Sequence, residues 1–405
     1  MNFSRRQFLT STGLGFLALG LPPSFLVRAA HAQTGRNKTL VVVFQRGAMD
    51  GLNAVVPFKD PAYYALRPSL AIAEPASGEN RVVDLDGFYG LHPALAPLRP
   101  IYERGQLAII HAAGSPDNTR SHFDAQDYME IGTPGIKSTP DGWLNRYLKE
   151  TAKSDTVFRG VALSAQMPRI LAGSARALTL ASVDEFRLRN EQTASLVQRI
   201  YSGTTDPIFR SGGENLFAAM NELNRIRAQV PPSAEVYPAG RFGVSLSQIA
   251  RLIKSGAGVE IAFTEIEGWD THVNQGGATG QMANRLKELA EGLAAFHRDL
   301  GDRMADVVLV TMSEFGRTAR ENGNRGTDHG HANVMFAMGG PVRGGKVYGR
   351  WPGLAPESLN EGRDLALTTD FRTVYAEVLK RHLGQTDLSR IFPGFRVPAP
   401  LGLIG

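Results

Sequence analysis

The sequence of 405 residues contains no cysteine, which excludes disulfide bonds, thiolate metal sites and cysteine nucleophiles. It also lacks a large excess of charge, with 44 Lys and Arg against 39 Asp and Glu. There is no basic stripe interleaved with aromatic residues, so nucleic acid is not an expected partner. Hydrophobic residues make up 42% and charged residues 20%, which is typical of a globular protein and excludes a disordered chain.

Long apolar runs are also missing. The most apolar stretch, from Gly13 to Val27, is interrupted by glycines and by Pro22-Pro23. A transmembrane helix needs roughly 20 consecutive apolar residues. We therefore expect no stable membrane span in the mature chain.

The N-terminal segment has the parts of a secretory signal. A charged start at Ser4–Leu9 (SRRQFL) precedes the apolar stretch, and Ala30–Ala32 (AHA) follows it. The paired arginines before Phe-Leu resemble the twin-arginine signal, which directs folded proteins to the twin-arginine export machinery. We expect residues 1–32 to be this signal and the mature protein, residues 33–405, to be periplasmic. A basic membrane anchor is the alternative interpretation.

Five apolar runs predict buried strands. They are Thr39–Phe44, Leu107–His111, Val259–Thr264, Val307–Thr311 and Val334–Met338. Helical spacing of apolar residues predicts helices over Phe242–Lys254, Gln281–Leu300 and Asp370–Leu383. Strands separated by helices favour an α/β fold with a mostly parallel central sheet and helices on both faces.

The segment 154–238 is less regular, being rich in Ser, Thr, Gly and Pro. We interpret it as an insertion or cap within a single domain, residues 33–405. Within it, helices are expected near Gln192–Tyr201 and Gly213–Ala228.

Reactive side chains follow the predicted strands, where open α/β sheets bind ligands. The residues concerned are Arg46, Asp50, Arg120, Ser121, His122, Asp270, His272, Glu314 and Arg317, with Asp328, His329 and His331 before the last strand. Carboxylates and imidazoles together suit Zn²⁺, Mn²⁺ or a similar ion. For any one Asp or His, helix capping or turn stabilisation is the structural alternative.

Ser121 precedes a predicted helix, where a serine acts either as an N-cap or as a nucleophile. Arg46, Arg120 and Arg317 can bind a phosphate or sulfate oxyanion or form surface salt bridges. A metal-free serine hydrolase ranks last, because the chain has no G-x-S-x-G elbow around Ser121.

Several segments together resemble one bacterial family over nearly the whole chain. They are VVVFQRGAMDGLN, GWDTHVNQ, TMSEFGRT, GTDHGHANVMFAMGG and SRRQFL. The family is a twin-arginine-exported domain of unknown function (1501), similar to the alkaline phosphatase and sulfatase-like superfamily. The resemblance implies a buried parallel sheet, usually with two metal ions.

The resemblance also implies roles for individual residues. Asp50 would bind one metal ion, and Asp270 with His272 would bind the other. Ser121 would be the nucleophile at the start of a helix. A final histidine ligand precedes the last strand, where His329 fits best and His331 is the alternative.

One departure concerns Ser313-Glu314, which stands after Thr311-Met312 where the superfamily usually has Asp-His. Glu314 can ligate a metal, whereas Ser313 replaces Asp poorly. One metal ion, a different metal, or loss of phosphatase chemistry would all fit.

Our leading hypothesis is a periplasmic hydrolase of phosphate or sulfate esters that uses one or two divalent ions (Zn²⁺, Mn²⁺ or Ca²⁺). Arg120 and Arg46 would orient the oxyanion of a small anionic ester. The alternative is a non-catalytic exported binding or assembly protein with a degenerate site.

Overall fold

Strand β1 (Thr39–Arg46) lies inside the large sheet, and its apolar side chains are buried on both faces. In the computed structural model, Val41 and Val43 join one core layer, whereas Leu40 and Val42 join the other. This alternation explains why the run is continuously apolar, since both faces of the strand must be covered by hydrophobic residues.

The structure describes residues 37–151, 156–185, 199, 201, 203 and 207–405. The predicted signal, residues 1–32, and most of the helix predicted near Gln192–Tyr201 lie outside these ranges. Lys38–Gly405 form one compact unit. Within the described ranges, no helix combines the length and the apolar character needed to cross a membrane.

The large sheet has nine strands in the order β11-β5-β10-β9-β1-β8-β6-β7, with β12 paired to β5. The other strands of this sheet are β5 (Leu107–Gly114), β6 (Gly160–Leu163), β7 (Leu178–Leu180), β8 (Ile261–Glu267), β9 (Val307–Met312), β10 (Asn333–Gly339), β11 (Lys346–Tyr348) and β12 (Thr369–Asp370). A small sheet contains β2 (Val55–Val56), β3 (Val83–Asp84) and β4 (Gly90–Leu91). The pairings of the large sheet are parallel except those of β10.

Strand β10 runs antiparallel to both of its neighbours, β5 and β9. The connection from β9 to β10, residues 313–332, contains no helix. A parallel return needs a crossover, usually a helix, so this chain comes back in the opposite direction. The start of β10 therefore lies at the edge of the sheet where β1, β8 and β9 end.

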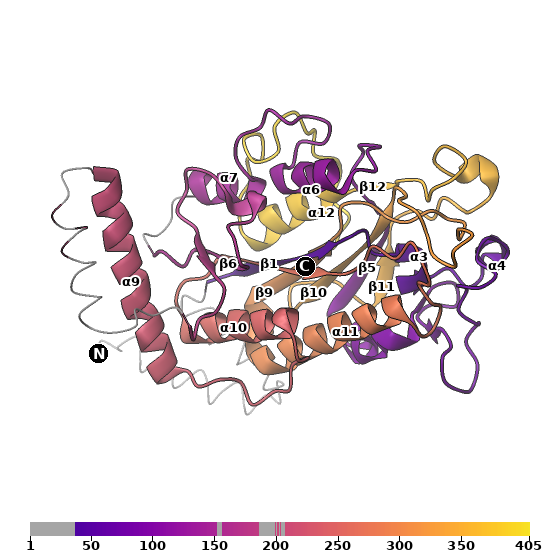
Figure 1. The fold of residues 1–405 in the computed structure, drawn as a ribbon, viewed down its shortest axis with the longest axis horizontal. Helices are drawn as coiled ribbons and strands as arrows, with labels where there is room; N and C mark the ends of the chain where they lie inside the picture. Colours follow the sequence, from indigo (N-terminus) through magenta and orange to yellow (C-terminus); the bar gives the residue numbers. More distant parts are fainter. Residues whose placement is uncertain (1–36, 152–155, 186–198, 200, 202, 204–206) are drawn as a thin grey trace, which may run out of the picture. The chain divides into compact units, whose positions relative to one another are not determined.

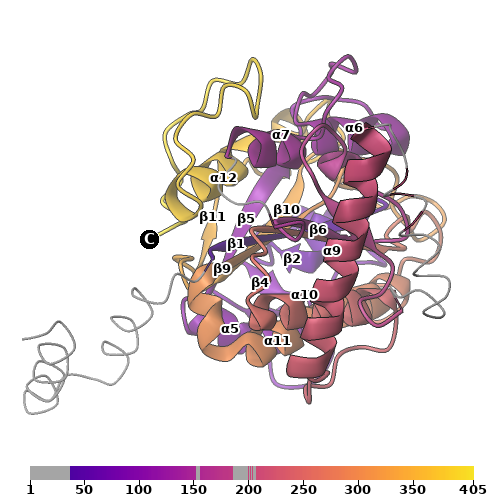
Figure 2. The same cartoon turned by 90° about the vertical axis from the view of Figure 1, so that its left-hand side faces the viewer.

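Helices cover both faces of the sheet, which confirms the predicted fold class (Figures 1 and 2). The α-helices are α3 (Gly51–Ala54), α4 (Pro61–Leu66), α5 (Arg99–Glu103), α6 (His122–Ile131), α7 (Trp143–Glu150), α9 (Pro207–Gln229), α10 (Arg241–Ser255), α11 (Gln281–Leu300) and α12 (Phe371–Glu377). Shorter turns are η1 (Pro93–Leu98), η2 (Arg169–Leu171), η3 (Gly301–Asp306), η4 (Pro356–Ser358) and the π-helical η5 (Val378–His382). Figure 1 shows α10 and α11 on one face, and α6, α7 and α12 on the other.

The longest predicted helix is observed with the predicted bounds. Leu286, Leu289 and Leu293 of α11 are fully buried on one side, as their helical spacing indicates. The helix ends at Leu300, and its C-cap residue Gly301 has a positive φ of 49°, which suits glycine. The segment predicted as an insertion contains the expected helix as part of α9, and it also contributes β6 and β7 to the large sheet.

Three buried histidines predict a loss of stability in acid. Burial lowers the pKa of His92, His111 and His382 to about 4 each. His111 is neutral, because Nε2 lies 3.1 Å from the Val55 carbonyl and Nδ1 accepts from Ala112 N at 2.9 Å. The unfolded chain protonates these groups near pH 6.5, so the stability that they contribute is complete above pH 6.5 and is lost as the pH falls towards 4.

We therefore expect the free energy of unfolding to fall between pH 6.5 and pH 4, by up to roughly 3 kcal/mol for each histidine. Urea denaturation at several pH values measures this slope. In His111→Asn the slope should be smaller, because the side-chain oxygen keeps an acceptor for Ala112 N and does not titrate. An unchanged slope in His111→Asn would contradict the explanation.

Candidate metal centre

Five separate segments meet at one edge of the large sheet. The parallel strands β1, β8 and β9 end there, and the antiparallel strand β10 begins there. The first turn of α6 reaches the same place, since His122 contacts Asp270 after β8 and Glu314 after β9. This is the edge at which open α/β sheets bind their ligands.

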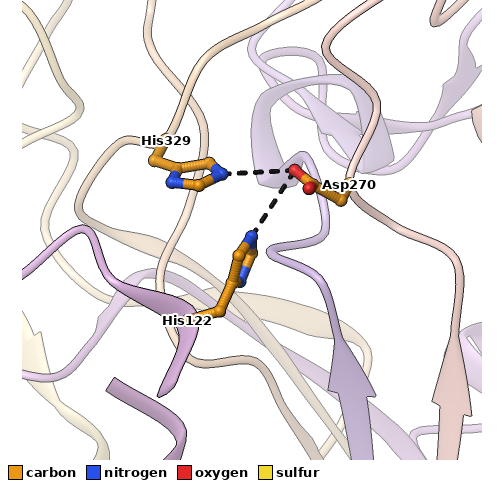
Figure 3. Close-up of side chains that lie close together, drawn as sticks. All are labelled: His122, Asp270 and His329. Carbon is orange, nitrogen blue, oxygen red and sulfur yellow. Dashed lines mark hydrogen bonds and ion pairs between the residues drawn. The ribbon is translucent and has the colours of Figure 1, made fainter. Parts of the chain in front are cut away.

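Three imidazoles converge on one carboxylate oxygen at this edge. The Nε2 atoms of His272, His329 and His122 lie 3.0, 3.2 and 3.5 Å from Asp270 Oδ1. Figure 3 shows His122 and His329 pointing at Asp270 from two different segments of the chain. Ligand atoms of His122, Asp270 and His329 all lie within 4.8 Å of one another. We call His122, His272, His329 and Asp270 the histidine cluster.

The Nδ1 atom of each imidazole, which points away from Asp270, forms a hydrogen bond to an acceptor. His122 Nδ1 lies 2.8 Å from Glu314 Oε1, and His272 Nδ1 lies 2.9 Å from Asp328 Oδ1. His329 Nδ1 lies 2.8 Å from the carbonyl of Arg120. Carboxylates and carbonyls accept hydrogen bonds, so each Nδ1 donates, and each Nε2 faces Asp270 and can bind a metal ion when it carries no proton.

The charges around the cluster keep its acid ionised. Partial burial opposes ionisation of Asp270, but the hydrogen bond and charge of Arg317, with His272 and His122, lower its pKa to about 2. The hydrogen bond that His122 donates to Glu314 raises the pKa of His122 against the effect of its burial. Burial and the charges of His122 and Arg317 lower the pKa of His329. Asp270 is therefore anionic and His329 is neutral at pH 7.

The buried guanidinium of Arg317 holds the loops of the cluster together. Its Nη2 atom donates to Asp270 Oδ1 and to the carbonyl of Gly47, both at 2.6 Å. Its Nε and Nη1 atoms donate to the carbonyls of Ala48 and Thr327 at 2.7 and 3.0 Å. Arg317 thus positions Asp270 by joining the loops after β1 and β8 to the segment before β10.

The loop after β1 can approach Asp270 closely because it contains Gly47. A Cβ at Gly47 would lie 2.9 Å from the backbone nitrogen of Asp270, and the φ of Gly47 is +112°. A side chain is therefore excluded both by space and by backbone conformation. Gly47 N also donates to Glu314 Oε1 at 2.8 Å, which ties the same loop to the end of β9.

The histidine cluster fits a divalent metal ion. Three imidazole nitrogens and one carboxylate oxygen form a donor set that Zn²⁺ prefers. His122 Nε2 is buried and makes no hydrogen bond, although it points towards Asp270. His272 Nε2 and His329 Nε2 lie 2.9 Å apart. At this distance the two nitrogens either share a proton in a hydrogen bond or bind one cation together.

Glu314, which we predicted as a metal ligand, lies behind His122 instead of within the cluster. It is fully buried and accepts from His122 and Gln126 at 2.8 Å, and from Ser313 Oγ at 3.0 Å. Hydrogen bonds from His122 and Gln126 lower the pKa of Glu314 against the opposing effect of burial. An anionic Glu314 orients the His122 imidazole and makes it more basic. Its Nε2 atom then binds a metal ion more strongly.

Removing the charge of Glu314 should weaken metal binding without removing a ligand. In Glu314→Gln, the side-chain oxygen can still accept from His122, but the imidazole becomes less basic. We expect the affinity for Zn²⁺ to fall about 10- to 100-fold, as measured by competition with a chelator. Glu267→Gln, an exposed residue at the end of β8, is the control and should bind like the wild type. Equal affinities in the two variants would rule out this positioning role.

Asp50, another predicted ligand, lies in a separate buried ion pair. Its Oδ2 accepts from Arg67 Nη1 and from Gln275 Nε2, both at 2.6 Å. Arg67 is fully buried and also donates to Asn53 Oδ1 at 2.8 Å. The structure therefore places a guanidinium, and none of the three clustered histidines, against the Asp50 carboxylate.

The predicted catalytic residues surround the cluster. Ser121 is the N-cap of α6, and its Oγ accepts from Asp124 N at 3.5 Å. Arg120 donates to Asp364 Oδ2 at 2.6 Å and pairs with Glu361 at 2.7 Å, while its carbonyl holds His329.

Arg46 and His331 also lie outside the cluster. Arg46 pairs with Glu130 at 2.9 Å and with Glu265 at 2.6 Å, and it donates to Gln126 Oε1 at 2.9 Å. His331 is buried, and burial lowers its pKa.

His122, which the sequence does not single out as a metal ligand, joins the cluster in the structure. It follows Ser121 after the second predicted strand, and the interpretation of this position favoured the hydroxyl over the imidazole. The available signal was its place beyond a strand end, which it shares with Asp270 and His272.

Residues 107–392 match the family described as "Protein of unknown function (DUF1501)". A comparison with curated proteins found no match.

Several solved structures resemble the chain at low identity. The sulfatase PsFucS1 from Pseudoalteromonas sp. is 12% identical, with 87% of this chain and 69% of that chain covered and a TM-score of 0.37. The C-terminal periplasmic domain of EcEptC from Escherichia coli, in complex with Zn, is 10% identical, with 75% and 73% covered and a TM-score of 0.35. The alkaline phosphatase from the Antarctic bacterium TAB5 is 10% identical, with 87% and 100% covered and a TM-score of 0.34.

Proposed function

Because the chain belongs to the DUF1501 family, whose description assigns no chemistry, we propose a function from the geometry of the histidine cluster. The protein is an exported, metal-dependent hydrolase of phosphate or sulfate esters. Its four cluster residues hold one divalent ion. The observation that carries this proposal is the convergence of three Nε2 atoms on Asp270 Oδ1, each imidazole being oriented through its Nδ1.

The donor set favours Zn²⁺ or Mn²⁺ over Ca²⁺, because Ca²⁺ prefers six or more oxygen ligands. It also favours one ion over two. The carboxylate of Asp50, which would hold a second ion, lies apart from the three imidazoles in a fully buried pair with Arg67. Glu314 is enclosed by its four hydrogen-bond donors.

A divalent ion at this cluster supplies Lewis acidity, which stabilises negative charge on the transferring group. Ser121 Oγ is our proposed nucleophile, since it precedes His122 and its capping hydrogen bond is long at 3.5 Å. Its oxygen forms the new bond to phosphorus or sulfur while its proton passes to solvent or a neighbouring base. The bond from phosphorus or sulfur to the ester oxygen breaks, and that oxygen takes up a proton from solvent and leaves as the alcohol. Water then hydrolyses the serine ester and restores Ser121.

We propose that Arg120 and Arg46 bind and orient the oxyanion of the ester. Each already pairs with two carboxylates. These carboxylates compete with any anion for the guanidinium. Both arginines also support the cluster directly, Arg120 through its carbonyl to His329 and Arg46 through Gln126 to Glu314.

Ester hydrolysis by the metal-loaded protein tests the proposed function. We expect turnover of an aryl phosphate or aryl sulfate by the wild type and its loss in Ser121→Ala. Ser121→Asn is the matched variant, because asparagine caps a helix as well as serine does but offers no nucleophile. Turnover that persists in both variants would remove Ser121 from the mechanism.

The enclosed Glu314 and the ion-paired Asp50 favour a second candidate function, an exported binding or assembly protein that holds a metal ion without turnover. Failure of the metal-loaded wild type to hydrolyse any ester while it retains the ion would favour this candidate.

The twin-arginine-like start supports export and a periplasmic location. We propose that residues 1–32 engage the twin-arginine machinery after the domain has folded. Replacing Arg5 and Arg6 with lysines should leave the protein in the cytoplasm, as cell fractionation would show.

A further inference from the structure

The three imidazoles of the histidine cluster differ in how closely the protein encloses them. The side chain of His272 is 39% exposed, whereas those of His122 and His329 are 23% and 22% exposed. The ring centroids of His122 and His329 lie 4.3 Å apart, and each ring also packs against the buried ring of Phe315, at 4.9 and 5.0 Å. Within the ranges that the structure describes, the His272 ring packs against one other ring, that of His329, at 4.7 Å.

The hydrogen-bond partners of the three Nδ1 atoms differ in the same way. His122 donates to Glu314, whose side chain is 0% exposed, and His329 donates to a main-chain carbonyl. His272 donates to Asp328, whose side chain is 55% exposed. Exposed pairs contribute little to stability, whereas separating the partners of a buried pair is costly. The His272 imidazole can therefore move at a smaller cost in free energy than that of His122.

The other three residues of the cluster can hold an ion without His272. Ligand atoms of His122, Asp270 and His329 lie within 4.8 Å of one another (Figure 3). Arg317 donates to Asp270 Oδ1 at 2.6 Å and keeps this carboxylate in place. Catalytic zinc sites have three protein ligands and one position for water or substrate, whereas four protein ligands are typical of structural sites. A four-coordinate centre that kept all four residues bound would have no position for the ester.

From these differences, and resting on the proposed function, we propose that His272 is an exchangeable metal ligand. The other three cluster residues hold the ion throughout. His272 gives up its position when an anionic oxygen of the phosphate or sulfate ester binds. Its imidazole turns towards solvent, on its exposed side, and keeps the Nδ1 hydrogen bond to Asp328. The exchange breaks one coordination bond and forms another, so it requires no proton, electron or co-reactant.

Metal binding by two alanine variants tests whether His272 is dispensable for holding the ion. In competition with a chelator, His272→Ala should bind one Zn²⁺ per chain, at least about tenfold more tightly than His122→Ala does. His122→Ala is the matched control, because it also removes one imidazole that faces Asp270 and donates to a carboxylate. An affinity of His272→Ala no higher than that of His122→Ala would overturn the inference.

The wild-type protein tests the exchange directly and does not depend on how well a variant folds. In crystals grown with Zn²⁺ and inorganic phosphate, the Nε2 atoms of His122 and His329 should stay at about 2.0–2.1 Å from the zinc ion. His272 Nε2 should lie beyond bonding distance, with a phosphate oxygen in its place. Crystals grown with Zn²⁺ alone are the control and should show all three imidazoles bound.

The possible failures separate this inference from the proposed function. Phosphate bound to the zinc ion with all three imidazoles retained, or with His122 or His329 displaced instead, would overturn the inference and leave the proposed hydrolase intact. Failure of the zinc-loaded wild type to bind phosphate in calorimetry would overturn the inference together with the anion-binding part of the proposed function. Failure of the wild type to bind Zn²⁺ would overturn the metal centre as well.

Discussion

His329→Ala should abolish the thermal stabilisation that Zn²⁺ gives to the wild-type protein. The substitution removes one of the three imidazole nitrogens that converge on Asp270, so that only those of His122 and His272 remain. A ligand at 100 times its dissociation constant stabilises a folded protein by about 2.7 kcal/mol. The wild-type melting temperature should therefore rise by several degrees with Zn²⁺, and that of His329→Ala should not change.

His331→Ala is the matched control for this experiment. His331 lies two residues further along the same segment, and its side chain is buried outside the histidine cluster. The variant can lose intrinsic stability, but it should keep the full response to Zn²⁺. A response that is lost in His331→Ala and retained in His329→Ala would show that the wrong imidazole has been assigned to the metal.

Arg67→Met should be the most destabilising of the substitutions considered. Arg67 and Asp50 form an ion pair with side chains 0% and 1% exposed. Removing the guanidinium leaves a buried carboxylate without its partner, and Asp50 Oδ1 already makes no hydrogen bond. Breaking such a pair costs about 3–5 kcal/mol. Urea denaturation measures this loss.

Two controls separate the buried ion pair from a general effect of charge. Lys59→Met breaks the ion pair between Lys59 and Glu74, in which both side chains are about half exposed. This substitution should lower the free energy of unfolding by less than about 1 kcal/mol. The double variant with Arg67→Met and Asp50→Asn should recover part of the loss, because no unpaired charge remains. A small loss in Arg67→Met, similar to that of Lys59→Met, would refute the role given to this pair.

Structural features that depend on local sequence alone are predicted correctly. The helix over Gln281–Leu300 follows from the spacing of its leucines, and β1 follows from a continuous β-branched run. Asp270, His272 and His329 were selected because they flank strands, and the structure brings them together. Their position depends on sheet topology, which the alternation of strands and helices already indicates.

The remaining features could not be predicted in this way. They depend either on contacts between residues that are far apart in the sequence or on the direction of a strand. The partner of Asp50 is Arg67, which no strand or motif marks as part of the site. Glu314 faces His122, and their pairing requires α6 to enter between the loops after β8 and β9. The antiparallel direction of β10 had a usable signal, because residues 313–332 carry no helical pattern for a crossover.

Anomalous X-ray diffraction from crystals grown with Zn²⁺ is the most direct test of the histidine cluster as a metal centre. The account predicts one strong zinc peak per chain, within about 2.0–2.2 Å of the Nε2 atoms of His122, His272 and His329 and of an oxygen of Asp270. A peak beside Asp50, two neighbouring peaks, or no peak among these imidazoles would contradict it.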